Sequence, residues 1–413
     1  MANLQEPPLE NGARSNTGKA VMILSDPPLP YRLHDWYFHK ITGTSFILLN
    51  MLNLQRGGVE DLTLYHPGLN AAALDGLRGD PRLTLEFHET SDTEALRQGV
   101  EAGEFRWVFE GSALYRKEFV RRVLEDPQRV EGLRAMTWTD IESMQSGIPA
   151  VPGGEQENRD GTPFLIEAPT EYRIRERRDF RRQTEALIKG SGLSNDSLLD
   201  RVVTRKISNA LTRLFLMTSL TPNQITLIAM AVGLAGAACF WAGGYAAGVA
   251  GAALVLLSAW IDCTDGEVAR LKFQESPMGG MLDIWADNVV HAAAFFSMGM
   301  GLYFSTENGI YKIFGTLAVV GTLASFALLH SSVIESKKRA ALNPEEEPEA
   351  SLVDRVANRD FTYFLFALCL AGRLEIFLAL TAVGANVFAV WLVFQKYRSA
   401  WSSSTELCAK NSE

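Results

Sequence analysis

The distribution of apolar residues divides the chain into two halves. Up to about residue 200, short apolar runs alternate with polar segments, whereas residues from about 222 to 398 are dominated by Ala, Leu, Val, Phe and Gly. This break predicts a water-soluble domain followed by a membrane-embedded one. The first 18 residues are rich in Pro, Asn, Gly and Ser and are expected to be disordered.

The polar half shows the pattern of a parallel sheet. Apolar runs bounded by turn residues predict strands, and the stretches between them predict helices. The predicted strands are 19–24, 61–65, 83–87 and 106–109, and the predicted helices are 46–54, 71–77 and 117–124. Because strands alternate with helices, the fold class expected for residues 19–190 is α/β with a mostly parallel sheet.

Two basic segments lead towards the membrane half. Arg173 to Arg182 holds six arginines in ten residues, which indicates either a solvated helix face or a basic collar close to anionic lipid headgroups. Residues 195–220 mix basic and apolar residues, as in a helix that lies in the membrane interface. We therefore predict a juxtamembrane amphipathic helix there.

The apolar half contains six stretches, most of them near the roughly 20 residues that cross a bilayer as a helix. They are 222–241, 244–262, 281–303, 310–333, 360–373 and 375–395, and the fifth is short enough to be tilted or partly interfacial. The expected architecture of residues 221–398 is therefore an all-α domain of six transmembrane helices, followed by a tail at 399–413.

Basic residues in the loops predict the orientation of these spans. Lys and Arg occur in the 263–280 and 335–359 loops and after the last span, but not at 242–244 or 304–309. By the positive-inside rule, both termini and the 263–280 loop are cytoplasmic. We expect a multi-pass integral protein, in the cell inner membrane, that contacts membrane lipids.

Composition excludes several other classes. The net charge of −9 gives no reason to expect nucleic-acid binding. The four cysteines show no C-x-x-C spacing and three lie in or beside apolar runs, so no disulfide framework is implied. The N-terminus has no basic stretch followed by a long apolar core, so no signal peptide is expected and the first half is predicted to be cytosolic.

Four acids lie at the ends of two apolar stretches. Asp262 and Asp265 are three residues apart and Asp283 and Asp287 are four apart, so each pair shares one helix face. Four carboxylates gathered at membrane depth would repel one another strongly, and divalent cations remove that problem. Because carboxylate oxygens are hard ligands, the pattern favours Mg²⁺ or Mn²⁺ over Zn²⁺.

The residues beside these acids fit an anionic ligand. Gly266 and Ala269 leave room for a flat group close to the backbone, and Arg270 is a permanent cation suited to phosphate. The whole stretch, from Asp262 to Asp287, resembles the signature D-x2-D-G-x2-A-R-x8-G-x3-D-x3-D of the CDP-alcohol phosphotransferase family at all eight fixed positions. The segment Thr221 to Thr226 also resembles the family's approach to its first membrane helix, and the family has six spans.

The resemblance implies a site and a reaction. Asp262, Asp265 and Asp283 would hold the metals, and Asp287 would either share in their coordination or act as general base. The residues implied to bind the CDP moiety are Asn223, Thr226, Gly266, Ala269, Arg270 and Gly279. An acceptor hydroxyl would attack the donor's β-phosphorus and CMP would leave, with two metals stabilising the charge. The family is typically homodimeric.

Arg355 and Arg359 precede the fifth span on the predicted cytoplasmic side. In family members that use a phosphorylated acceptor, basic residues near this place bind the acceptor phosphate. The alternative is that both are ordinary positive-inside residues.

The N-terminal half resembles a sugar-phosphate nucleotidyltransferase domain, as is fused to some members of the membrane family that make their own CDP-inositol. Its chemistry is expected to be lost. The glycine-rich phosphate loop after the first strand is replaced by Ser25 to Arg32, which contains three prolines and no glycine. The segment around Glu110 stands where a metal-binding Asp would be expected. We therefore predict a degenerate domain.

These features predict a membrane transferase with a CDP-linked donor and an alcohol or alcohol-phosphate acceptor. The donor is either CDP-diacylglycerol or a soluble CDP-alcohol such as CDP-inositol. One alternative is an inactive membrane scaffold that anchors the N-terminal domain, and another is a bifunctional enzyme with an active cytidylyltransferase domain. A chain that starts near Asn195 is expected to keep transferase activity, because every signature residue follows that point.

Overall fold

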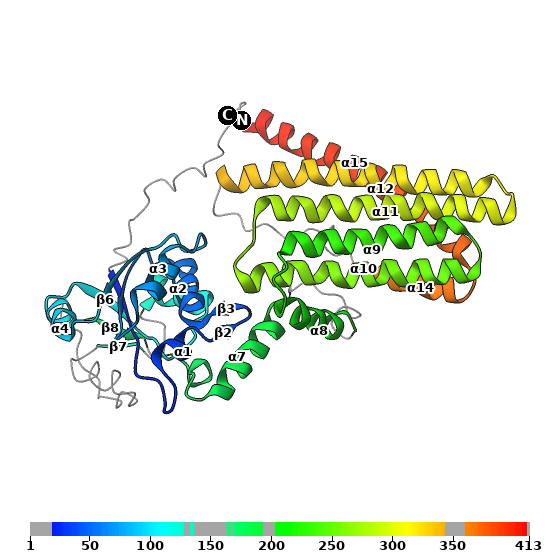
Figure 1. Cartoon of the computed structure of the whole chain (residues 1–413). Coiled ribbons are helices and arrows are strands. Elements are labelled where there is room, and N and C mark those ends of the chain that lie inside the picture. The colour runs from blue at the N-terminus through cyan, green and yellow to red at the C-terminus, as the bar shows by residue number, and fades with distance from the viewer. Residues whose placement is uncertain are drawn as a thin grey trace. The chain divides into compact units, whose positions relative to one another are not determined.

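A computed structural model describes residues 19–127, 133–135, 163–166, 168–192, 203–342 and 360–410 (Figure 1). The chain forms two compact units, Met1–Leu187 and Ile188–Glu413. The first is an α/β domain and the second is helical, which confirms the predicted fold class.

The N-terminal unit is built on a six-stranded sheet in the order β5-β4-β1-β6-β8-β7. All neighbouring strands are parallel except β7 and β8, which pair antiparallel. The strands are β1 (Lys19–Ile23), β4 (Asp61–Tyr65), β5 (Glu86–Thr90), β6 (Phe105–Glu110), β7 (Leu133–Ala135) and β8 (Phe164–Ile166), and a separate hairpin joins β2 (Lys40–Ile41) to β3 (Thr44–Ser45). The helices are α1 (Leu33–Tyr37), α2 (Phe46–Gly57), α3 (Ala71–Arg78), α4 (Thr93–Glu101), α5 (Lys117–Glu125) and α7 (Arg177–Gly190), with a 3₁₀ turn at Thr170–Tyr172.

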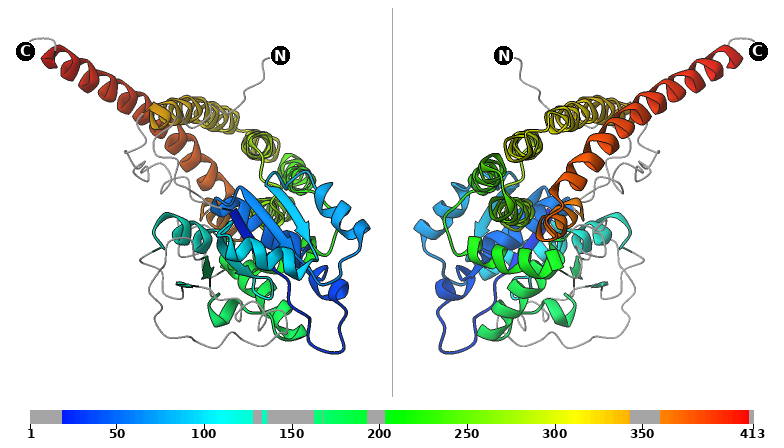
Figure 2. Two further views of the ribbon diagram at one scale, coloured as in Figure 1. Left: turned by 90° about the vertical axis from the view of Figure 1, so that its left-hand side faces the viewer. Right: turned by 90° about the vertical axis from the view of Figure 1, so that its right-hand side faces the viewer.

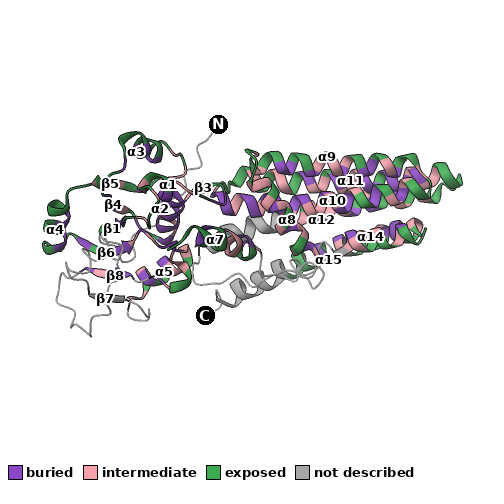
Figure 3. Ribbon diagram, turned by 60° about the horizontal axis from the view of Figure 1, so that its bottom comes forward, coloured by how far each residue is buried: buried purple, intermediate pink, exposed green. Residues whose placement is uncertain are grey.

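The core of this unit follows from its apolar strands. The central strand β1 is buried along Ala20 to Ile23, and α2 is buried along nearly its whole length (Figure 3). Gly58, at a φ of 107°, ends α2 in the left-handed region that glycine adopts without strain. Continuous apolar runs of this kind are typical of strands covered on both faces.

One predicted strand is displaced. The sequence predicts a strand at 83–87, but β5 runs from Glu86 to Thr90. The reason is a side chain from α2: Oε1 of Gln55 accepts hydrogen bonds from the backbone N–H groups of Thr84 (2.7 Å) and Leu85 (2.9 Å). These two N–H groups are thereby taken before the strand can begin.

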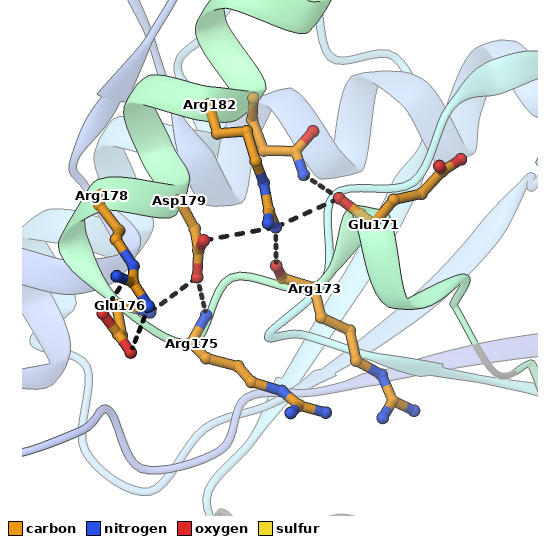
Figure 4. A network of polar contacts seen from close by, with 8 residues as sticks. Glu171, Arg173, Arg175, Glu176, Arg178, Asp179 and Arg182 are labelled. Atoms are coloured by element: carbon orange, nitrogen blue, oxygen red, sulfur yellow. Dashed lines mark hydrogen bonds and ion pairs between the residues drawn. The ribbon is translucent and has the colours of Figure 1, made fainter.

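The arginine-rich segment forms the start of α7 and the turn before it (Figure 4). The carboxylate of Asp179 accepts hydrogen bonds from the backbone N–H groups of Arg175 (2.9 Å) and Glu176 (3.0 Å), and it pairs with Arg182 at 3.3 Å. Arg178 pairs with Glu176 at 2.9 Å. Part of the basic charge therefore holds the beginning of the helix together, while the exposed arginines are compatible with both predicted roles.

The second unit consists of long helices that run side by side (Figures 1 and 2). They are α8 (Arg205–Leu216), α9 (Pro222–Ala242), α10 (Tyr245–Lys272), α11 (Pro277–Thr306), α12 (Ile310–Leu342), α14 (Asp360–Leu370) and α15 (Leu374–Lys410). Among the described residues, five helices are long and apolar enough to cross a membrane, namely α9, α10, α11, α12 and α15. The shorter α14 occupies the place of the predicted fifth span.

Large apolar side chains such as Trp241, Phe296 and Val390 are exposed on these helices, as expected of a surface that faces lipid. The protein is thus an integral membrane protein.

Caps and small residues fix the helices. The side chain of Thr221 and that of Gln224 form a reciprocal capping box at the start of α9, with Pro222 in the first turn. Ser276 caps α11 in one direction only, since its hydroxyl accepts a 3.0 Å hydrogen bond from the N–H of Gly279. Further along, a Cβ on Gly301 of α11 would overlap the carbonyl oxygen of Phe240 in α9, so these two helices touch backbone to backbone.

The predicted cytoplasmic loop at 263–280 is much shorter in the structure. The helix α10 continues to Lys272 and α11 begins at Pro277, so only residues 273–276 connect them. The prediction of a longer loop is wrong because the polar residues after Asp262 do not end the helix. They instead share it with buried residues at helical spacing, Thr264, Val268 and Leu271.

Candidate active site

Three of the four predicted acids gather where α10 and α11 approach each other. Carboxylate oxygens of Asp262, Asp265 and Asp283 all lie within 4.8 Å of one another. Asp262 and Asp265 are buried one turn apart on α10, and Asp283 is half-buried on the second turn of α11. Because only residues 273–276 connect α10 to α11, the end of α10 lies close to the start of α11, and the three side chains meet there.

The donor set fits a divalent cation. Three ionised carboxylates this close would repel one another strongly unless a positive charge lay between them. Oxygen-only ligands suit Mg²⁺ or Mn²⁺. Asp287 is not part of this group: it lies four residues beyond Asp283 on α11 and is half-buried.

A pocket of about 270 Å³ opens beside the acids. Asp265 and Asp283 line it, and so do all six residues predicted to bind the CDP moiety. These are Asn223, Thr226, Gly266, Ala269, Arg270 and Gly279. Asp262 and Asp287 are not among its lining residues. Arg355 and Arg359 lie outside the described residues, so their predicted role stays a prediction.

Thr226 fixes one of the acids. Its hydroxyl donates a short hydrogen bond to Oδ2 of Asp265, and it also donates to the carbonyl of Pro222 at 3.2 Å. Thr226 is almost fully buried. A carboxylate held by a neutral donor keeps its negative charge and its orientation, which are the properties that a cation ligand needs.

The glycines of the pocket are explained by close approaches. A Cβ on Gly279 would lie 3.0 Å from Oδ1 of Asn223 and 3.1 Å from the hydroxyl of Ser276. A larger side chain there would press the start of α11 away from the start of α9. A Cβ on Gly266 would lie 3.3 Å from the guanidinium of Arg270. Both positions therefore keep the pocket open.

Arg270 is the cation of the pocket, and a residue far away in sequence holds it. Its Nε donates a 3.0 Å hydrogen bond to the backbone carbonyl of Ser191, directly after α7. No local pattern in the sequence marks Ser191, because this contact spans 79 residues. The pocket is completed by Pro222, Gln274, Glu275, Ser276 and Gly280, which were also not predicted.

Glu267 lies inside the signature at a position that the signature leaves open. It is 2% exposed, and all its described donors come from α8. Its carboxylate accepts hydrogen bonds from the hydroxyls of Ser208 (2.5 Å) and Thr212 (2.5 Å), and it forms an ion pair with Arg205 (3.2 Å). A single carboxylate on α10 thus fastens the amphipathic helix beside the site.

A second polar contact ties the short helix α14 to the same region. The hydroxyl of Tyr363 accepts a 2.9 Å hydrogen bond from Nε1 of Trp260 on α10. The hydroxyls of Tyr363 and Thr204 lie 2.8 Å apart. The start of α14 is therefore held against α10 just before the acids.

In the N-terminal unit, the carboxyl ends of β1 and β6 mark the point where ligands bind in open α/β sheets. There, the buried hydroxyl of Tyr37 donates to the carbonyl of Ser25 at 3.0 Å, and burial raises its pKa well above the ordinary value. Glu110 accepts a short hydrogen bond from Ser112 and pairs with Arg173 at 3.4 Å. The one acid at the end of β6 is thus already engaged with a guanidinium.

Fold and site together define an integral membrane protein with an acid-lined polar pocket at one end of its helices. Residues 219–393 match the family model described as CDP-alcohol phosphatidyltransferase. The match covers the part of the chain that holds the signature, and it confirms the resemblance found there.

Curated relatives extend the comparison. The chain is 29% identical over 211 residues to a bifunctional IPC transferase and DIPP synthase of Rubrobacter xylanophilus, which covers 49% of this chain and 44% of that protein. It is 31% identical over 130 residues to an archaetidylinositol phosphate synthase of Methanothermobacter thermautotrophicus, covering 30% of this chain and 62% of that one. The chain thus spans less than half of the bifunctional relative.

Among solved structures, a phosphatidylinositol phosphate synthase of Mycobacterium tuberculosis with CDP-DAG bound matches at 20% identity. The match covers 46% of this chain and 92% of that one, with a TM-score of 0.36.

Proposed function

We propose that the protein transfers a substituted phosphate group from a CDP-linked donor to an alcohol and releases CMP. The observation that carries this proposal is the convergence of Asp262, Asp265 and Asp283 beside a pocket that also contains Arg270. A pyrophosphate needs both features, since it is a ligand for divalent cations and for a guanidinium. The family match of residues 219–393 supports the same reaction class.

In this reaction an oxygen of the acceptor hydroxyl forms a bond to the donor's β-phosphorus. The bond between that phosphorus and the oxygen bridging the two phosphates breaks, and CMP leaves with the electron pair. Mg²⁺ or Mn²⁺, when bound by the carboxylates, supplies positive charge that stabilises the transferring group and the leaving phosphate. The acceptor's proton must go to a base.

We assign this base role to Asp287. It lies outside the three-acid group but on the same helix, about one turn beyond Asp283. A carboxylate that does not share the cation is better able to accept a proton than one that does. Asp287 as a fourth ligand, as the signature implies, is the competing assignment.

The other pocket residues have binding roles. Arg270 contacts the donor's phosphates, Thr226 orients Asp265, and Asn223 lies where α9 meets α11. Gly266, Ala269 and Gly279 leave the wall of the pocket free for the nucleotide. Arg355 and Arg359 are proposed to hold an acceptor phosphate, as the family resemblance implies.

Two donors remain in competition. CDP-diacylglycerol would give a phospholipid with an acceptor such as inositol phosphate or glycerol phosphate, and a soluble CDP-alcohol such as CDP-inositol would give a phosphodiester. The relatives are named for inositol-phosphate products, which favours inositol chemistry. Purified protein in lipid nanodiscs, incubated with each radiolabelled donor and each acceptor, should release CMP only with the correct pair.

The rival proposal is an inactive membrane scaffold. It predicts no Mg²⁺-dependent CMP release with any pair of substrates. The transferase proposal predicts release that is lost in Asp287→Ala, because the acceptor proton then has no base. CMP release at the wild-type rate in Asp287→Ala would remove Asp287 from the mechanism.

For the N-terminal unit we propose a degenerate nucleotidyltransferase domain without cytidylyltransferase activity. The pairing of Glu110 with Arg173 supports this, because that carboxylate is the one acid at the end of β6. The full chain carrying Asp265→Asn, which should block the transfer step, tests it. Release of pyrophosphate from CTP and inositol phosphate by this variant would instead identify a bifunctional enzyme.

We also propose that the pocket and both termini face the cytoplasm of a cell inner membrane, on the basis of the loop charges. Reaction of Lys338→Cys in intact cells with a membrane-impermeant maleimide tests this orientation. We expect the cysteine to react only after the cells are opened. Labelling of intact cells would show that the orientation is the opposite of the proposed one. We further propose that the protein contacts membrane lipids and forms a homodimer, as the family resemblance implies.

A further inference from the structure

The guanidinium of Arg270 is held from outside its own helix. Nε of Arg270 donates to the carbonyl of Ser191 at 3.0 Å, so this hydrogen bond does not use the two terminal nitrogens of the guanidinium. Ser191 is itself fixed: its N–H and its hydroxyl both donate to the carbonyl of Ile188, at 3.3 and 2.8 Å. The last turn of α7 therefore presents a rigid acceptor to the cation of the pocket.

The next residue, Gly192, is packed just as closely. A Cβ added to Gly192 would overlap the guanidinium of Arg205. That guanidinium cannot easily move, because it pairs with Glu267 at 3.2 Å, and Glu267 lies three residues before Arg270 on α10. Ser191 thus contacts Arg270, which belongs to α10, and Gly192 lies against Arg205, which pairs with Glu267 one turn before Arg270.

We propose that Ser191 and Gly192 are positioning residues for Arg270, so that the end of α7 forms part of the donor site. An arginine side chain has many rotamers, and a phosphate binds better to one whose fork is already directed at it. The Ser191 carbonyl fixes Nε, and the glycine allows the backbone to come close enough to do so. The inference rests on the proposed function for its kinetic consequence but not for its geometry.

Removing residues 1–194 would also remove the contact that holds Arg270. A chain beginning at Asn195 retains every signature residue but lacks Ser191. It is expected to bind the donor less well than the full chain, in contrast to the expectation from the signature alone.

Two substitutions in the full chain test the proposal. Gly192→Ala introduces the overlap with Arg205, and Ser191→Gly loosens the carbonyl without any clash, so that at least one folded variant is available. Gly384→Val is the control, because Gly384 on α15 has open space around it. Thermal melting in detergent verifies that each variant is folded.

The first measurement is the rate at which phenylglyoxal modifies Arg270, followed by mass spectrometry of the peptide. A hydrogen bond from a charged donor corresponds to a change of roughly tenfold or more in the population of the released side chain. Both variants should therefore be modified roughly tenfold faster than the wild type, and Gly384→Val at the wild-type rate. Unchanged reactivity of Arg270 in both variants overturns the inference, whatever the protein's activity.

The second measurement is CMP release in a double-mutant cycle. Each variant should raise the KM for the CDP donor and lower kcat/KM roughly tenfold when Arg270 is present, but less than twofold in the Arg270→Ala background. Equal losses in both backgrounds would show that Ser191 and Gly192 act on the structure generally, and not through Arg270. A wild type that releases no CMP while the variants still expose Arg270 would refute the proposed function and leave the positioning role standing.

Discussion

Replacing Glu267 by Ala should detach the amphipathic helix α8 from the transmembrane helices. The substitution removes the acceptor of two hydroxyls and one guanidinium at once, in an interface where Glu267 is 2% exposed. Ser208 and Thr212 would then be buried donors without this acceptor. Arg205 would keep a charge that is only partly exposed.

The expected loss is large for a single side chain. Removing one partner of a buried ion pair costs about 3–5 kcal/mol, mainly because the other charge stays buried. The apolar contacts of Leu211 and Phe215 with the Ile225 cluster remain, so the helix should open more often and not be lost entirely. A free energy of this size raises the open population by a factor of roughly 10² to 5 × 10³.

Alkylation of a cysteine placed on α8 reports this opening. Leu211→Cys, which replaces a partly buried side chain against the cluster, should react roughly 10²-fold faster or more when combined with Glu267→Ala. The matched control is Glu375→Ala, since Glu375 forms a more exposed pair with Arg373 at 3.5 Å, and such pairs contribute about 1 kcal/mol or less. If both substitutions changed the alkylation rate of residue 211 equally, Glu267 would not be the fastening point of α8.

Two further predictions concern the two units separately. Thr226→Val, which removes the hydroxyl that orients Asp265, should lower CMP release roughly tenfold with little change in melting temperature, and full activity would show that the carboxylate needs no such support. In the N-terminal unit, two hydrogen bonds from Arg82 to Asp80, at 2.8 and 2.7 Å, lower the pKa of Asp80. The carboxylate therefore adds stability above its unfolded pKa of about 3.9 and loses that contribution as the pH falls through its lower folded pKa. Arg82→Ala should accordingly destabilise this unit by about 1–3 kcal/mol at pH 7 in urea unfolding and by less near pH 3, whereas an equal difference at both pH values would contradict the linkage.

The sequence predicts the elements whose signals are local. Apolar runs bounded by turn residues identify β1, β4 and β6, and the apolar stretch that begins at residue 222 identifies α9. The position of β5 was not predictable in this way, because the amide of Gln55, from another helix, determines where the strand begins. Long-range hydrogen bonds override local propensity in such cases.

The same distinction applies to the site. The spacing within each pair shows that Asp262 shares a helix face with Asp265 and that Asp283 shares one with Asp287. The structure brings Asp262, Asp265 and Asp283 together. The partners of Glu267 and Arg270 come from segments 55 to 79 residues away, so no spacing rule could indicate them. Glu267 offered one signal, a charged residue at helical spacing among buried residues, which predicts a partner but does not identify it.

The central claim is that the three aspartates hold a divalent cation on which CMP release depends. The most direct test measures both quantities on one sample, by titrating metal-free protein in nanodiscs with Mn²⁺ and following bound Mn²⁺ by electron paramagnetic resonance together with CMP release from the CDP donor. We predict that both rise together in the wild type and that Asp283→Asn lowers both, because it removes one of the three carboxylates. CMP release at the wild-type rate without bound metal, or from Asp283→Asn that binds no Mn²⁺, would contradict the account.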